Sequence, residues 1–402
     1  MRKEKSYLIK NARPVGFAGK GKEELELINI GINKGKVSYI GQNDPETAYD
    51  RKIDLKGSYL SPGWIDLHTH IYGVCDIAVD PVRVGPATGV ILPVDAGTAG
   101  EASFDGFKKY IVNNYDFPIK AYLNIGSTGI VAANRVSEVA TIDCVNLDNT
   151  IRCIENNRDI IKGIKVRASR AIVREWGDKV VKLAKTVSNI VDLPLVVHIG
   201  EPPIFLKDLV EILDKGDMIT HCYNGKRGSN LLQDKNIIHN LKTAQEKGIL
   251  LDVGHGSASY SQKAAEKAYK LEIHPYSTGT DIHNQNIEGP VWDLPLTMSK
   301  IMALGYTLPE IIEKVTKNAA EFLGLKDWYT LKENNQAYFT AFKIKEGEFP
   351  VEDSAATGEV TAAAENERYK FKIKKIICPE WSFYEENVIK AESNYIKGRR
   401  NE

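Results

Sequence analysis

The chain has 402 residues, 43% of them hydrophobic, and its 53 Lys and Arg balance 53 Asp and Glu. This length exceeds one ordinary domain and suits a barrel of ~250 residues beside a smaller module. A net charge of zero argues against nucleic acid or an anionic membrane surface as the main partner, since both favour a basic excess.

Targeting and membrane signals are weak in this sequence. No apolar run approaches about 18 residues, the length that a membrane-spanning helix needs. The charged start is followed by a short apolar stretch that Lys10 and Asn11 interrupt, unlike a signal peptide. Five cysteines without CxxC spacing favour reduced thiols, and we therefore expect a cytoplasmic protein.

The first sixty residues have the pattern of short strands separated by turns. The turn residues Asn33-Lys34-Gly35-Lys36 predict a hairpin between two of these strands. The predicted strands cover residues 7–10, 25–32, 36–40 and 52–55.

From Ser61-Pro62-Gly63 to about Gly324, short apolar runs alternate with amphipathic stretches. This alternation predicts parallel β/α units, and eight of them predict a (β/α)8 barrel of the α/β class. The predicted strands are residues 64–67, 89–94, 119–125, 163–166, 193–197, 217–220, 248–253 and 274–279. The clearest helical patterns are residues 178–191, 205–213 and 233–247, the second with Phe205, Leu209, Ile212 and Leu213 on one face.

After a predicted helix over residues 308–323, the pattern returns to strands at 337–344, 358–362 and 369–377. We expect these strands to join the amino-terminal ones in a small β-sandwich module. The predicted domains are therefore residues 1–60 plus 327–402 and a barrel over 61–326, and the last twenty residues are expected to be a charged helix or tail.

The placement of the eight histidines is the main chemical signal. His68 and His70 lie two apart at the end of the first barrel strand, so both point to one side. Four more polar residues end or closely follow later predicted strands: His198, His221, His255 and Asp281. Catalytic groups of such barrels gather at the carboxyl ends of strands, and His with Asp suits divalent cations, most often zinc.

A single histidine at a strand end is more often a packing residue than a ligand, but five at such positions favour ligands. For His239 and His274, in helix and strand-start contexts, packing is the better interpretation. His283, two residues past Asp281, is a weaker candidate for a substrate contact.

Lys165 and Arg167 share one face of an apolar strand. Burying an unpaired ammonium costs several kcal/mol. Reaction with CO2 would turn Lys165 into an anionic carbamate able to bridge two metal ions. Alternatively, the strand faces a helix layer and both side chains extend outward to solvent. Periodicity leaves both interpretations open.

The segment Pro62-Gly63-Trp64-Ile65-Asp66-Leu67-His68-Thr69-His70 resembles the first-strand signature of the amidohydrolase superfamily. Residues 163–167 resemble the strand that carries a carboxylated lysine, and residues 316–324 resemble the helix that closes the barrel. Within the superfamily, the chain resembles in particular the deacetylase-like branch, which is also termed dihydroorotase-like or acetyl-mandelate esterase-like. Its supporting segments are residues 94–100, 165–169, 220–225 and 252–256.

The resemblance implies a site for two divalent metal ions, zinc being the usual one. His68, His70 and Asp281 would hold the more buried ion, His198 and His221 the more exposed one, and carboxylated Lys165 would bridge them. Two such ions can share a hydroxide that attacks an amide, cyclic amide or ester. Asp281 is the implied catalytic residue, which transfers a proton to the leaving group.

Candidate substrate contacts are less defined. Arg167 can bind a substrate carboxylate bidentately, or it can serve a structural ion pair. His255 is a second candidate contact or hydrogen-bond donor. Tyr223 and Asn224, just past His221, are weaker candidates.

We therefore expect a hydrolase that removes an acyl group from an N-acyl or O-acyl compound bearing a carboxylate. A dihydroorotase-type cyclic-amide hydrolase is the alternative; an adenine-type deaminase or a non-catalytic scaffold fits the ligand positions less well. The expected partner is a small molecule, without nucleic acid or membrane, and homo-oligomers are common among such enzymes.

Overall fold

The computed structural model describes residues 5–18, 26–132, 135–200, 204–226, 229–232, 234–356 and 368–400. The expected strand at 358–362 lies outside these residues. Within them, no helix is both long and apolar enough to cross a membrane.

Seven parallel strands form the barrel sheet, and they follow one another in chain order. All eleven residues of β7 are buried, which explains why the barrel strands appear in the sequence as continuous apolar runs. The strands are β6 (Trp64–Thr69), β7 (Val90–Gly100), β8 (Lys120–Asn124), β9 (Ile161–Ala168), β10 (Leu195–Ile199), β11 (Met218–Thr220) and β12 (Leu250–Asp252).

The eighth predicted strand, at 274–279, is not a regular strand. This segment nevertheless lies between β12 and β6, because Ser277 bridges to Asp252 and Ile282 bridges to Thr69, both in parallel. The Asp252 carboxylate accepts hydrogen bonds from the Ser277 hydroxyl and the Gly279 amide, at 2.7 and 2.8 Å. A side chain thus takes the place of a regular ladder and closes the (β/α)8 barrel.

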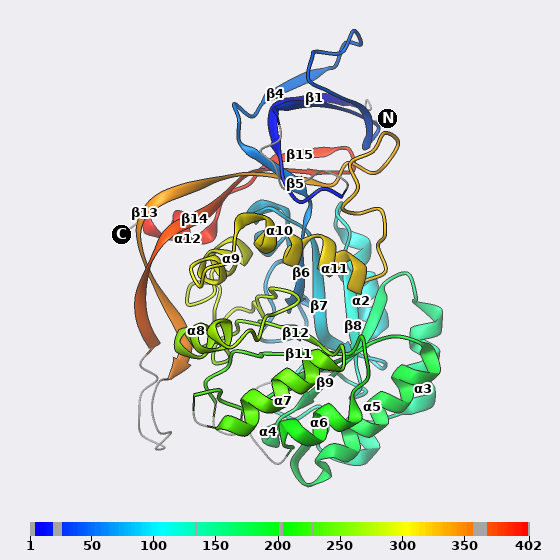
Figure 1. The fold of residues 1–402 in the computed structure, drawn as a ribbon. Helices are drawn as coiled ribbons and strands as arrows, with labels where there is room; N and C mark the ends of the chain where they lie inside the picture. Colours follow the sequence, from blue (N-terminus) through cyan, green and yellow to red (C-terminus); the bar gives the residue numbers. More distant parts are fainter. Residues whose placement is uncertain are drawn as a thin grey trace.

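Helices surround the barrel strands (Figure 1). The predicted helix at 178–191 is confirmed, whereas the one at 205–213 begins at Leu206, so Phe205 is its N-cap and is 58% exposed. The long helix predicted at 308–323 is broken at Thr316. The helices are α1 (Pro81–Val84), α2 (Phe104–Tyr110), α3 (Leu147–Asn156), α4 (Arg170–Val173), α5 (Asp178–Val191), α6 (Leu206–Ile212), α7 (Lys235–Glu246), α8 (Gln262–Lys270), α9 (Leu294–Met302), α10 (Leu308–Val315), α11 (Lys317–Phe322) and α12 (Asn394–Arg399).

Both ends of the chain build a second sheet, as expected, with strand order β15-β14-β13-β5-β1-β2-β3 and β4 paired with β1. The hairpin predicted at Asn33–Lys36 is confirmed, with Lys34 and Gly35 at φ 52° and 71°. The strands are β1 (Ser6–Pro14), β2 (Ile28–Asn33), β3 (Lys36–Gly41), β4 (Arg51–Asp54), β5 (Tyr59–Pro62), β13 (Phe339–Ala356), β14 (Arg368–Tyr384) and β15 (Asn387–Lys390). The boundary proposed between residues 60 and 61 falls inside β5.

Two features connect this β-module with the barrel. The long β13–β14 hairpin runs down one side of the barrel toward α8, and α10 and α11 lie between the module and the barrel strands (Figure 1). Ala319, Ala320 and Leu323, in and just after α11, pack against interior residues such as Ile65 and Leu92. This packing closes one end of the barrel, and the candidate ligands gather at the carboxyl ends of the strands.

Candidate metal centre

His68, His70 and Asp281 come together where β6 ends. Their nearest ligand atoms all lie within 4.8 Å of one another. Asp281 Oδ1 is 3.1 Å from His70 Nε2 and 3.4 Å from His68 Nε2. Burial alone would raise the pKa of Asp281, but the two histidines and His221 hold it well below its usual value. Two imidazoles and an ionised carboxylate form a donor set that suits a divalent cation.

Lys165 points into the same cluster from β9. Its Nζ lies 3.1 Å from His68 Nε2, and the side chain is 1% exposed. Burial lowers the pKa of Lys165 to about 8, so the neutral amine that reacts with CO2 is accessible near neutral pH. Gly97, at φ +83°, gives this side chain its room, because a Cβ there would lie 2.6 Å from the Lys165 Cβ.

His198 and His221 complete the set from the ends of β10 and β11. Their ring centroids are 4.4 Å apart, and His68 is 5.2 Å from His221. The Nδ1 of His221 contacts the Gly254 carbonyl at 2.6 Å, which leaves Nε2 as the ring's acceptor. This Nε2 is buried without a hydrogen-bond partner among the described residues. A buried acceptor in that state suits a metal ligand, and the donor set therefore fits the expected ions.

Two of the candidate ligands have strained backbones. His221 and Asp281 adopt φ angles of 71° and 51°, a left-handed region that few non-glycine residues occupy. Such strain persists only where the surrounding structure enforces it, and it is concentrated at functional sites.

Buried carboxylates support the histidines from behind. Asp252 accepts a 2.7 Å hydrogen bond from Thr220, whose hydroxyl lies 3.1 Å from His68 Nδ1. Asp66 accepts hydrogen bonds from the amides of His68 and Thr280, both at 3.1 Å. Burial raises the pKa of Asp66 to about 7. These contacts fix the ring of His68 and the segment that carries Asp281.

His70 has a support of its own in the β7 turn. Its Nδ1 lies 2.9 Å from the Thr98 hydroxyl, and the Thr98 amide donates to Asp95 at 2.7 Å. The other oxygen of Asp95 accepts from the Ile71 amide at 3.0 Å. Partners of this kind orient metal-binding histidines in proteins.

A cavity of about 150 Å³ opens at this cluster. Arg167 borders it, but its guanidinium is already paired with Glu138, at 2.6 and 2.7 Å. His283 also borders the cavity and contacts the Ser257 hydroxyl at 2.8 Å. Among the described residues, the lining comprises His68, His70, Ile77, Ile130, Lys165, Arg167, His198, Asp281, His283 and Gln285.

Three predicted substrate contacts lie outside this lining. His255 is fully buried, and its Nε2 contacts Lys300 Nζ at 2.9 Å. The Tyr223 hydroxyl donates to the Ile273 carbonyl at 2.8 Å. Asn224 is fully buried and donates to the His221 carbonyl at 2.8 Å, which helps to hold the ligand loop.

Sequence reasoning missed the supporting residues. Asp66, Asp95 and Asp252 are carboxylates in otherwise apolar strands, and that anomaly is a signal that could have found them. Glu138 lies in the irregular segment between β8 and α3, where periodicity carries no information. His283 borders the cavity, although its position in a loop made it a weak candidate for a substrate contact.

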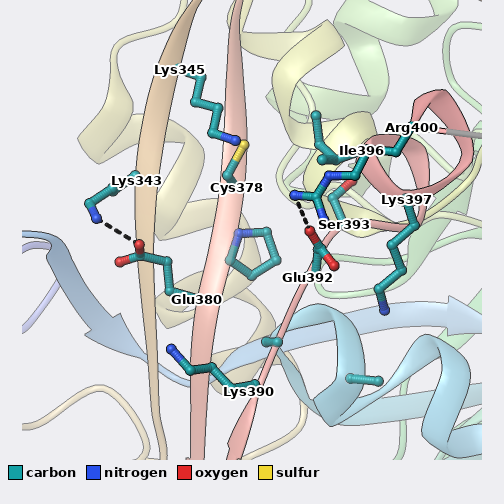
Figure 2. Close-up of a pocket in the computed structure, with 13 residues that line it drawn as sticks. Lys343, Lys345, Cys378, Glu380, Lys390, Glu392, Ser393, Ile396, Lys397 and Arg400 are labelled. Atoms are coloured by element: carbon teal, nitrogen blue, oxygen red, sulfur yellow. Dashed lines mark hydrogen bonds and ion pairs between the residues drawn. The ribbon is translucent and has the colours of Figure 1, made fainter. Parts of the chain in front are cut away.

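A larger cavity, of about 520 Å³, lies where the β-module meets Ala87, and none of these candidate ligands lines it. Figure 2 shows it between β13, β14, β15 and α12, with the carboxylates of Glu380 and Glu392 pointing toward Lys343 and Arg400. Both ion pairs are short, at 2.7 and 2.6 Å. Since its carboxylates are neutralised and its described lining contains no histidine, this cavity is a poor candidate for the metal chemistry.

Two relatives that cover most of this chain are both named deacetylases. No protein-family model matches the chain. A deacetylase of Agrobacterium fabrum is 39% identical over 98% of this chain and 93% of its own length. A deacetylase of Brucella anthropi is 41% identical over 87% of each chain.

Solved structures agree over both parts of the fold. A crystal structure described as a dihydroorotase has a TM-score of 0.88 and 37% identity, and covers 96% of this chain and 98% of that chain. One described as an adenine deaminase has a TM-score of 0.84 and 31% identity, and covers 96% and 99%. These similarities extend over the barrel and the β-module alike.

Proposed function

The chain belongs to the amidohydrolase superfamily and is a hydrolase acting on C–N bonds, and from this we propose a two-metal deacetylase of small molecules. The proposed substrates are N-acyl or O-acyl compounds that carry a carboxylate near Arg167. The proposed cofactors are two divalent ions, zinc in the first place, and a CO2-derived carbamate on Lys165.

One observation carries the proposal most strongly: the buried Nε2 of His221 has no hydrogen-bond partner among the described residues, and the ring lies close to the other candidate ligands His68 and His198. We assign His68, His70 and Asp281 to one ion and His198 and His221 to the other, with modified Lys165 between them. With this assignment the ligand cluster itself contains no buried ammonium, because carbamylation removes the positive charge of Lys165.

Divalent ions at such a site polarise a substrate carbonyl and lower the pKa of the attacking water. The chain's own residues position the reacting groups and move a proton. Asp281, held ionised by His68 and His70, accepts the proton of the attacking water and delivers it to the departing nitrogen or oxygen. Ile77 and Ile130 form an apolar wall of the small cavity, and this wall suits a short acyl group.

A cyclic-amide hydrolase remains the second candidate, because a structure described as a dihydroorotase is 37% identical over nearly the whole chain. Ring opening uses the same ligands and differs in the substrate pocket. Zinc-loaded protein should therefore be tested with N-acetyl-D- and L-amino acids, acetylated hydroxy acids and cyclic ureides. Release of acetate supports deacetylation, ring opening supports the second candidate, and inactivity on every compound would refute both.

The metal assignment is tested with Lys165→Ala. We expect about two metal equivalents per wild-type chain and a loss of at least about 10³-fold in kcat for the variant. Lys162→Ala is the matched control, since Lys162 lies on the same strand with its Nζ 2.9 Å from the Arg158 carbonyl, away from the cluster. Wild-type protein that holds no metal after gentle purification would contradict the assignment.

A further inference from the structure

Glu138 occupies one edge of the Arg167 guanidinium. The Nε and Nη2 of Arg167 donate to the two carboxylate oxygens, at 2.6 and 2.7 Å. A guanidinium has five N–H bonds, so this side-on pairing leaves the opposite edge, Nη1 with the second N–H of Nη2, for other acceptors. Among the described residues nothing accepts from Nη1, and the Arg167 side chain borders the cavity.

Glu138 is held in a fixed position beside Arg167. The residue is 3% exposed, although it lies in an irregular segment between β8 and α3. Its neighbour Ser137 anchors that segment, because the Ser137 hydroxyl donates to the Ile172 carbonyl at 2.8 Å and accepts from the Val139 amide at 3.2 Å. A Cβ on Gly126 would lie 2.7 Å from the Glu138 carbonyl oxygen, so the chain packs closely here.

We propose that Glu138 sets the charge selectivity of the site: it aims the free edge of Arg167 at the substrate and cancels the cation's net charge. The inference rests on the proposed function and specifies how its substrates are recognised. Arg167 then binds a carboxylate or a carbonyl by hydrogen bonds, and anionic compounds gain little from long-range attraction to it. Substrates with a neutral acceptor at this position are accepted alongside carboxylates.

Removing the charge of Glu138 should therefore favour anions. With an effective dielectric constant of about 20, a charge on the far side of the guanidinium changes ion binding by roughly an order of magnitude or more. We expect Glu138→Gln to lower the Kd of an anionic ligand about tenfold relative to its neutral amide. The glutamine keeps an oxygen that can accept from Arg167, so the guanidinium stays in place.

The test measures Kd by calorimetry for N-methylsulfonylglycine and for its primary amide, neither of which is hydrolysed. Because the readout is binding, it stays informative even if the enzyme fails to release acetate, and in that case only the proposed function is contradicted. Glu155→Gln is the matched control. Glu155 pairs with Arg158 through the same Nε and Nη2 atoms, but on the exposed surface of α3. We expect the control variant to change the ratio of these two Kd values less than about twofold.

A second variant covers the case in which Glu138→Gln does not fold. Glu138→Gln with Arg167→Met replaces the ion pair by neutral side chains, a change that buried pairs often tolerate. If the Glu138–Arg167 pair already presents no net charge to the ligand, the ratio of the Kd values for the anion and its amide should change little. In this double variant it then stays within about threefold of wild type. A folded Glu138→Gln variant with an unchanged ratio, or a double variant that loses anion preference more than tenfold, would overturn the proposal.

Discussion

Three of the candidate ligand histidines, His68, His70 and His221, use Nδ1 for a contact that fixes the plane of the ring. For His70 that contact is Thr98, 2.9 Å from Nδ1, and Thr98 is itself tied to Asp95 through its amide. Thr98 is fully buried, so no water replaces its hydroxyl without rearrangement. The orientation of His70 therefore depends on a residue outside the candidate ligand set.

Thr98→Ala tests this dependence. The variant leaves His70 Nδ1 without its partner, and we expect the affinity for the ion assigned to His68, His70 and Asp281 to fall about 10- to 100-fold. Competition with a fluorescent chelator measures the affinity. Thr98→Ser keeps the hydroxyl and should stay close to wild type. Equal losses in the serine and alanine variants would show that the methyl group, through packing, is what matters.

At the scale of elements, the β-module braces the loop that follows β12. The Ser354 hydroxyl, on β13, accepts from the amides of Ser259 and Tyr260, at 3.2 and 2.9 Å, and donates to the His255 carbonyl at 3.0 Å. The same loop contains Gly254, whose carbonyl contacts the ring of His221. A strand of the terminal module thus supports a candidate metal ligand of the barrel.

Ser354→Ala removes this brace. Leaving two buried amides unsatisfied should lower the free energy of unfolding by about 1–3 kcal/mol. We also expect weaker metal binding at His221, measured as a lower occupancy of the second ion. Ser382→Ala is the control, since Ser382 is buried in the same module but donates once, to the Pro86 carbonyl at 2.7 Å. Full metal occupancy in the Ser354 variant would contradict the coupling.

At the scale of the whole molecule, the sequence predicts those strands and helices that depend on a local pattern of apolar residues. Seven barrel strands and helix α5 were found because buried parallel strands and amphipathic helices leave continuous or periodic apolar runs. Strand β5 is four residues long and gains its order from pairing with β13, which lies far along the chain. The candidate ligand cluster could be predicted from strand-end histidines, whereas the Glu138 contact could not, because a tertiary ion pair has no sequence period.

Buried cations make the stability of the whole molecule depend on pH. Burial lowers the pKa of Lys314 from 10.5 to about 8, and its Nζ has the Pro275 carbonyl as its hydrogen-bond acceptor, at 2.6 Å. Between pH 7 and 8.5 the folded protein loses this proton while the unfolded chain keeps it. Since the unfolded state then binds more protons, stability rises with pH, by about 0.8 kcal/mol from this group. Lys300, with a pKa lowered to about 7, acts in the same direction.

Lys314→Met isolates the contribution of Lys314 to the pH dependence of stability, because methionine fills a similar volume and carries no charge. We expect urea unfolding at pH 7.0 and 8.5 to give a larger gain in stability for wild type than for the variant, by roughly 0.5–1 kcal/mol. Metal binding and Lys300 contribute equally to both proteins, so the difference belongs to Lys314. An equal gain in the two proteins would mean that the buried ammonium keeps its proton through this range. The positive charge of Lys314 would then be stabilised in place by the Tyr306 ring, 4.8 Å away, and by the Pro275 carbonyl.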